Sequence, residues 1–238
     1  MADQTLDRIL QSQGFGSRKD CRRLIARGLV AVGGEVVTDW GRRFETAGLA
    51  FAVGDEAVSY QKHLYLALHK PRDFECSRRP SHHPSVLSLL PERYQRREVQ
   101  PVGRLDHDTT GLLLLSDDGA FIHRQSSPRH RVPKVYVATT HKPVTPELVQ
   151  QLLAGVKLHD EPAPVAARAC LALDRQRLEI VLEQGKYHQV KRMLAAAGNH
   201  CSALQRIAIG GLRLDALGLA EGRWCHLDRA QLALLAPA

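Results

Sequence analysis

A run of four leucines, Leu112–Leu115, constrains the fold of this chain more than any other segment. Residues that favour turns and helix starts flank the run, with Gly103–Gly111 before it and Asp118-Gly119 after it. A short, continuous apolar run between such breakers is typical of a buried strand. We therefore expect a buried core strand that is entered through a rigid polar loop and followed by a helix extending toward Arg124.

The loop before this strand contains two carboxylates, Asp106 and Asp108. A carboxylate in a rigid loop can be positioned for chemistry, but it can equally cap a turn. Composition and spacing alone favour the turn-capping role for Asp106.

Charge is unevenly distributed along the 238 residues. Lys and Arg total 33 and Asp and Glu total 25, so the net charge is +8. Residues 1–60 contain eight residues of each sign, and the whole positive excess lies in residues 61–238. This excess favours a polyanionic partner, with nucleic acid as the first candidate. The apolar runs are too short to span a membrane and residues 1–5 do not resemble a signal peptide, so we expect a cytoplasmic protein with no membrane partner.

The cysteines and histidines do not predict a metal site. The five cysteines are far apart and form no Cys-x-x-Cys pair, which argues against a zinc ribbon or a redox dithiol. Residues 72–100 are expected to be loop-rich, either as a second RNA-facing surface or as an ordinary insertion. His82 and His83 in this stretch do not belong to a spacing of cysteines and histidines that is typical of a metal site.

Five basic residues lie between positions 18 and 27, with Asp20 as the one acidic residue among them. A helix that begins after an N-cap at Ser17 and stops at Gly28 would place them on one broad side and leave an apolar back. Another helix is expected over residues 6–13, and residues 29–37 predict two short strands joined at Gly33-Gly34. The basic residues are Arg18, Lys19, Arg22, Arg23 and Arg27.

This arrangement resembles the S4-type RNA-binding module, in which two helices and a hairpin present basic side chains to structured RNA. The resemblance covers residues 6–55 and implies a small α/β RNA-binding domain over residues 1–60. A solvated helix face without a ligand is the general alternative for a charge run. The order of helix, glycine stop and hairpin favours RNA binding by the five basic residues.

Residues 103–112 read Gly-Arg-Leu-Asp-His-Asp-Thr-Thr-Gly-Leu. This segment resembles the catalytic motif of the RNA pseudouridine synthases, in particular the type that carries an S4 module and modifies small-subunit ribosomal RNA. Four further motifs of the family occur in order, at residues 68–71, 127–136, 185–194 and 210–212. Each motif alone is weak, but five ordered motifs form a strong combined signal.

The resemblance implies an α+β fold in which the N-terminal module precedes a catalytic domain over residues 61–238. That domain should contain a mixed, mostly antiparallel sheet flanked by helices, with Asp106 in a central basic cleft. The implied reaction is an isomerisation: the C1′–N1 bond of a uridine breaks, the uracil turns within the pocket, and C5 is joined to C1′. The family chemistry implies no cofactor and no metal.

Three residues are implied to carry this chemistry. Departure of the uracil leaves C1′ electron-poor, so the ionised carboxylate of Asp106 can stabilise or trap it; attack on the ribose, attack on the base and removal of a ribose proton all remain open. A nearby cation keeps a buried carboxylate charged, and Lys191 matches the family's basic position. Arg192, the next residue on a helix expected over 189–197, points about 100° away and should face RNA phosphate. Tyr136 is implied to stack on the flipped uridine.

Other basic residues of the second domain are also expected to contact RNA. The resemblance implies that Arg104 helps to displace the target base, with a surface salt bridge to Asp108 as the alternative. Residues 123–134 contain four basic and no acidic residues, which predicts a phosphate track that includes Arg129 and Lys134.

Short stretches at residues 83–91, 155–159 and 206–211 resemble the 16S subgroup more than the 23S enzymes. They imply a synthase of the uridine-516 type that acts on 16S ribosomal RNA in an assembling small-subunit particle, and we expect it to be a monomer. His107 and His69 depart from the family pattern, in which an apolar or aromatic residue and an asparagine are usual. The alternatives are a 23S synthase, a non-catalytic ribosome-assembly factor, and a hydrolytic N-glycosidase that would release free uracil.

Overall fold

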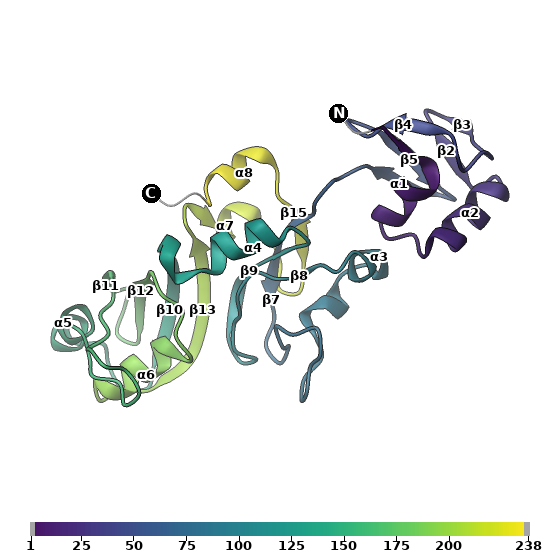
Figure 1. Ribbon diagram of the computed structural model, residues 1–238. Helices are drawn as coiled ribbons and strands as arrows, with labels where there is room; N and C mark the ends of the chain where they lie inside the picture. The colour runs from purple at the N-terminus through teal and green to yellow at the C-terminus, as the bar shows by residue number, and fades with distance from the viewer. Residues whose placement is uncertain (1–2, 236–238) are drawn as a thin grey trace. The chain divides into compact units, whose positions relative to one another are not determined.

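The computed structural model describes residues 3–235, which divide into two compact units (Figure 1). The first unit contains the described residues of Met1–Leu64 together with Leu90–Val99, and the second contains Tyr65–Leu89 and the described residues of Gln100–Ala238. The expected domain limit at residue 60 ignores Leu90–Val99, which the sequence analysis placed in the second domain. Charged residues give this segment the composition of a loop, and the sequence therefore does not reveal that Tyr94 and Val99 are buried.

The described residues of the first unit form three helices and two small sheets. Its sheets have the strand orders β3-β2-β5-β6 and β1-β4. As predicted, Ser17 caps the basic helix α2: its side chain accepts the N–H of Asp20, whose carboxylate in turn accepts the N–H of Ser17. The predicted helices and the hairpin at Gly33-Gly34 are confirmed. The elements are β1 (Asp3–Thr5), α1 (Leu6–Ser12), α2 (Arg18–Ala26), β2 (Val30–Val32), β3 (Glu35–Val36), β4 (Arg43–Glu45), β5 (Ala50–Val53), β6 (Glu56–Ser59) and α3 (Glu92–Arg96).

The second unit is built on one long sheet with the strand order β11-β12-β10-β13-β9-β7-β15. Among the described residues, β13 and β9 form the one parallel pair along this sheet, and the other pairs are antiparallel, as predicted for a mixed and mostly antiparallel sheet. The strands are β7 (Tyr65–Lys70), β8 (Gln100–Pro101), β9 (Thr110–Ser116), β10 (Lys134–Thr140), β11 (Ala169–Ala172), β12 (Arg177–Leu182), β13 (Cys201–Ile209), β14 (Leu212–Arg213) and β15 (Trp224–His226).

Helices cover the two halves of this sheet separately (Figure 1). Apolar residues of α5 and α6 pack on β10, β12 and β13 in one core, and those of α4 and α7 pack on β7 and β9 in another. Leu112–Leu115 are fully buried, as their run predicts. The helices are η1 (Val86–Leu89), α4 (Gly119–Ser126), η2 (Pro128–His130), α5 (Pro146–Ala154), α6 (Gln189–Ala196), α7 (Leu214–Leu217) and α8 (Arg229–Ala233).

The two halves of the sheet meet where β13 runs beside β9. The parallel register is short and pairs Gln205 with Thr110 and Arg206 with Gly111. The polar loop of residues 103–109 ends at this junction, so the sequence segment that most resembles a catalytic motif lies where the two cores adjoin. None of the helices in the described chain combines the length and the apolarity that crossing a bilayer requires.

Candidate active site

The loop that carries Asp106 is held from below by a buried lysine. Lys70, at the end of β7, is fully buried, and its ammonium group donates hydrogen bonds to the carbonyl oxygens of Pro71 (2.9 Å), His107 (3.0 Å) and Thr109 (2.9 Å). Burial lowers the pKa of Lys70. Because two of the three acceptors belong to the loop, Lys70 fixes the backbone on both sides of Asp108.

A glycine fixes the exit of the same loop. Gly111 has φ of 108°, a conformation that L side chains rarely adopt, and a Cβ at this position would overlap the carbonyl oxygen of Arg206 on β13. Gly111 therefore lets β9 approach β13 closely, immediately after the loop of residues 103–109.

Lys191 connects helix α6 to the carboxylates of the loop. Its Nζ lies 3.0 Å from Oδ2 of Asp106 and 2.6 Å from Oδ1 of Asp108. Burial opposes the charges of Lys191 and Asp108, but their mutual hydrogen bond prevails, so the pKa of Lys191 is raised and that of Asp108 is lowered. The sequence analysis anticipated an ion pair with Asp106 and missed the shorter contact with Asp108.

The alternative salt bridge from Arg104 to Asp108 is absent from the described residues. Asp108 binds Lys191 instead, and the exposed side chain of Arg104 makes no hydrogen bond or ion pair in residues 3–235. Arg104 therefore lines the site as an exposed cation without an ion-pair partner among the described residues, which is consistent with its expected contact with RNA.

His188 is a neighbour of Asp106 that the sequence analysis did not single out. It occupies the N-cap position of α6 in a left-handed conformation (φ 46°), and its Nε2 lies 3.3 Å from Oδ1 of Asp106. Its ring stacks on Tyr187, whose side chain is 71% exposed, with the centroids 3.8 Å apart. The available signal was spacing: His188 precedes Lys191 by three residues, which places both in the first helical turn on one side.

Tyr136 lines the same small cavity as Asp106. This cavity, of about 70 Å³, is also bordered by Arg104, Gly185 and His188. Tyr136 is half-buried on β10, where it pairs in register with Ile180 of β12 and Arg206 of β13. The structure thus brings Asp106, Tyr136 and Lys191 to one place, while their catalytic roles stay predictions.

A wider cleft of about 770 Å³ opens beside Asp106, which is large enough for a nucleotide. Residues 103–107 and 185–188 form two of its walls, and the loop of residues 75–83 forms another. Glu75 orders that loop, because its carboxylate accepts the backbone N–H groups of Ser81, His82 and His83. These hydrogen bonds lower the pKa of Glu75 to about 2.

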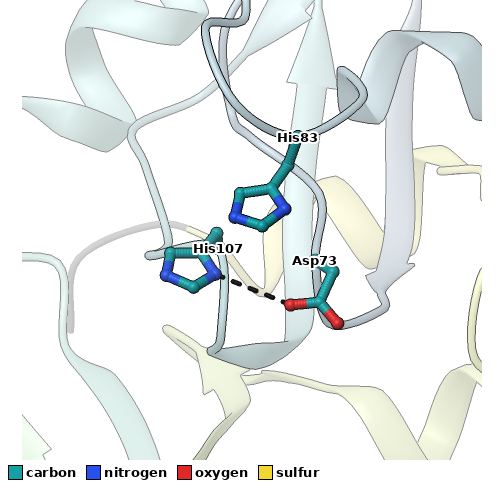
Figure 2. A group of neighbouring side chains, drawn as sticks. All are labelled: Asp73, His83 and His107. Atoms are coloured by element: carbon teal, nitrogen blue, oxygen red, sulfur yellow. Dashed lines mark ion pairs between the residues drawn. The ribbon is translucent and has the colours of Figure 1, made fainter.

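His83 has polar neighbours that its sequence surroundings did not reveal. Figure 2 shows His107 and Asp73 beside it: His107 Nδ1 lies 3.6 Å from Oδ1 of Asp73, and the two histidine rings stack with centroids 4.4 Å apart at 13°. Their nitrogen and oxygen atoms are close enough together to hold a metal ion. Two imidazoles that share one metal must direct their in-plane lone pairs to one point, whereas stacked rings direct them side by side. The present arrangement is therefore an aromatic stack supported by an ion pair.

The remaining side chains that are predicted to contact RNA differ in their exposure and in whether they already bind a protein group. Arg192 donates to the carbonyl of Tyr187 (3.0 Å) and pairs with the Asp160 carboxylate, so an RNA phosphate would have to compete for it. Arg129 in η2 is exposed, and Lys134 at the start of β10 is half-buried.

In the first unit, two of the five basic residues serve the fold. Arg18 and Arg22 each place Nε 2.8 Å from Oδ2 of Asp7, which is fully buried. Burial opposes the charge on Asp7, but hydrogen bonds from Thr5 and the two arginines lower its pKa to about 2. Lys19, Arg23 and Arg27 are exposed. Arg23 also pairs with Asp20 at 3.6 Å, so the expected RNA-binding face includes three arginines that already have a partner.

Comparisons with known proteins agree with these features. The family described as RNA pseudouridylate synthase matches residues 64–196, and the S4 domain family matches residues 4–46. The ribosomal small subunit pseudouridine synthase A of Escherichia coli (strain K12) is 36% identical over 228 residues, which cover 96% of this chain and 98% of the relative. The protein of the same name from Yersinia pestis is 35% identical and covers 96% of each chain.

One solved structure extends the likeness to three dimensions. A crystal structure of a pseudouridylate synthase is 30% identical, covers 98% of this chain and 99% of its own, and superimposes with a TM-score of 0.69.

Proposed function

Because the chain belongs to the RNA pseudouridylate synthase family and contains an S4 domain, we propose that this RNA pseudouridine synthase isomerises a uridine of small-subunit ribosomal RNA. The names of its relatives support this substrate, since those that are 35–36% identical over 96% of the chain are small-subunit enzymes. The sequence stretches at residues 83–91, 155–159 and 206–211 support it independently.

The observation that carries the proposal is the placement of Asp106. Its carboxylate borders a cleft that can admit a nucleotide, and one cation and one imidazole contact it. A carboxylate has about four lone-pair directions, so one contact on each oxygen leaves both oxygens able to face a substrate. Lys191 places a positive charge 3.0 Å from the carboxylate that we propose reacts.

We assign the roles as follows. As the C1′–N1 bond breaks, its electron pair leaves with the uracil, and the Asp106 carboxylate stabilises or traps C1′. The uracil turns and C5 bonds to C1′, which releases the Asp106 carboxylate where it has trapped C1′. The proton on C5 is then lost to solvent, and N1, which carries the electron pair of the broken bond, takes up a proton. Tyr136, on the wall of the same cavity, stacks on the flipped base, and Arg104 occupies the space that the base leaves in the RNA. Exposed basic side chains of the S4 domain bind the surrounding RNA.

Tritium release from C5-labelled 16S and 23S ribosomal RNA tests the assignment of Asp106. Asp106→Asn keeps the shape of the side chain but removes its charge, so we expect turnover to fall at least about 10³-fold while RNA affinity changes little. Asp174→Asn, in an exposed turn of the same unit, is the control and should retain full turnover. Turnover by Asp106→Asn near that of the control would exclude the proposed role.

The choice of RNA tests the substrate. We expect release from 16S RNA and not from 23S RNA, and faster release from partly assembled small-subunit particles than from naked RNA. We propose uridine 516 of 16S RNA as the target, which carbodiimide-dependent stops of reverse transcription would map. Release from 23S RNA alone would support the large-subunit alternative, and free uracil among the products would indicate a glycosidase.

A further inference from the structure

Two cations share one face of the sheet next to Tyr136. Lys134 and Tyr136 are two residues apart on β10, so their side chains point to the same side of the strand. Arg206 pairs with Tyr136 across β10 and β13, and side chains of paired residues project to the same face. The pairing of β10 with β13 shifts by one residue between Val135 and Tyr136, and the lining of a common cavity shows that the lysine, the tyrosine and the arginine lie together.

Arg206 is buried but incompletely paired. It is 4% exposed, and its Nε donates to the carbonyl oxygen of Leu112 (2.8 Å). Its Nη2 is buried without a hydrogen-bond partner, and no carboxylate forms an ion pair with Arg206 in residues 3–235. A buried charged donor without a partner is costly, and such groups occur where a ligand or ion supplies the missing acceptor.

Lys134 lacks an anion as well. Its ammonium group makes no hydrogen bond or ion pair in the part of the chain that the structure describes. Burial, and next the like charge of Arg206, lower the pKa of Lys134 to about 8. Glu183 lines the same cavity as the two cations, but its carboxylate accepts a hydrogen bond from Arg168 at 3.0 Å. The two cations therefore repel each other, and no carboxylate among the described residues forms an ion pair with either of them.

These side chains border a small, partly open cavity. A cavity of about 90 Å³, called here the Lys134 pocket, is lined by Arg104, Lys134, Tyr136 and Arg206 among others. One water takes up roughly 30 Å³ in the liquid, so the pocket has room for a tetrahedral oxyanion. Arg104, Tyr136 and Gly185 also line the cavity of Asp106, so the two spaces lie on either side of the same residues.

We propose that the Lys134 pocket is a phosphate subsite, and that it binds the RNA backbone phosphate next to the target uridine. The proposal rests on the proposed function, since the phosphate is that of the RNA substrate. Lys134 supplies a point charge and Arg206 a free N–H, while Tyr136 separates the phosphate from the base. Holding the phosphate on one side of Tyr136 fixes the ribose over Asp106 on the other, which positions C1′ for the reaction.

Sulfate, a dianion of the same shape, tests the subsite without RNA turnover. Titration calorimetry on the full chain should show one sulfate site that Lys134→Gln weakens about tenfold, since a charge-assisted hydrogen bond is lost. Lys134→Arg should restore the site. Lys142→Gln is the matched control, because Lys142 is exposed just beyond the opposite end of β10. Equal sulfate binding by wild type and Lys134→Gln would overturn the proposal.

Combining the Lys134→Gln substitution with modified RNA linkages, as in a double-mutant cycle, then identifies which phosphate the pocket binds. The substrate is a 16S fragment in which the linkage on either side of the target uridine is a neutral methylphosphonate. A methylphosphonate at one of the two linkages should raise the KM of wild type about tenfold. The same methylphosphonate should not raise the KM of Lys134→Gln further. If the methylphosphonate raises KM by the same factor in wild type and in Lys134→Gln at both linkages, the assignment to an adjacent phosphate is wrong. Absence of turnover by wild type on the unmodified fragment would count against the small-subunit substrate, and the sulfate experiment would still decide the subsite.

Discussion

Replacing Lys70 with methionine removes the ammonium group that holds the catalytic loop while preserving most of the volume of the side chain. Hydrogen bonds from a charged donor are worth about 1.5–3 kcal/mol each, so the three bonds to Pro71, His107 and Thr109 contribute roughly 5–9 kcal/mol before desolvation is considered. Burying the ammonium costs several kcal/mol. We therefore expect Lys70→Met to lower the free energy of unfolding of the second unit by about 3 kcal/mol.

Urea unfolding followed by tryptophan fluorescence measures this change. Trp224 on β15 pairs with Leu68 on β7 and reports on the second unit, so the experiment uses a Trp40→Phe background. With a slope of about 2 kcal/mol per molar urea, the expected loss moves the midpoint by about 1.5 M. Arg175→Met, at an exposed residue of the second unit, is the control and should change the free energy by less than about 0.5 kcal/mol.

Lys70→Met should also have a reduced kcat when turnover is measured at a urea concentration at which the variant is fully folded. Loss of the ammonium releases the carbonyls of His107 and Thr109 on both sides of Asp108, and a displacement of about 1 Å at a catalytic group can cost about 10²-fold in kcat. An unchanged midpoint together with an unchanged kcat would refute the argument that Lys70 holds the loop.

Two further predictions concern Gly111 and Asp7. Gly111→Ala should destabilise the second unit by more than about 2 kcal/mol in the same urea assay, because its Cβ would overlap the Arg206 carbonyl oxygen at a positive φ; Gly119→Ala, which meets open space, should not. The folded-state pKa of Asp7, about 2, lies below its ordinary value of 3.8, so its ionised form contributes about 2 kcal/mol that is present at neutral pH and lost as pH falls from about 5 to 2. Asp7→Asn should remove this slope from acid unfolding curves and Asp55→Asn should retain it; equal slopes would contradict the role of Asp7.

Local sequence patterns were sufficient where one element determines its own boundaries. Ser17 and Gly28 bracket α2, Asp118 caps α4, and Leu112–Leu115 form a fully buried strand, because caps, glycine stops and apolar runs act within a few residues. Helix α3 escaped prediction because it is five residues long, and the burial of Tyr94 depends on contacts within the first unit.

Contacts between distant segments explain what the sequence left undetermined in the site. The motif resemblance pointed to Asp106, Tyr136 and Lys191, which the structure places around one cavity and ion pair. Asp108 and His188 belong to the same motifs. The sequence does not reveal, however, that Asp108 binds a lysine 83 residues away. The partial burial of Lys134 beside Arg206 follows from strand pairing, whereas its sequence neighbours are those of an exposed basic loop.

The ion pairs of Lys191 link the two halves of the sheet. Lys191 belongs to α6, whose apolar side packs in the core of β10, β12 and β13, while Asp106 and Asp108 precede β9 in the other core. Between these cores, the parallel register of β13 and β9 pairs only Gln205 with Thr110 and Arg206 with Gly111. The distance from Lys191 to the carboxylates therefore depends on how both cores pack. It follows that substitutions in the α6 core, far from any substrate, can change kcat by shifting the lysine relative to Asp106.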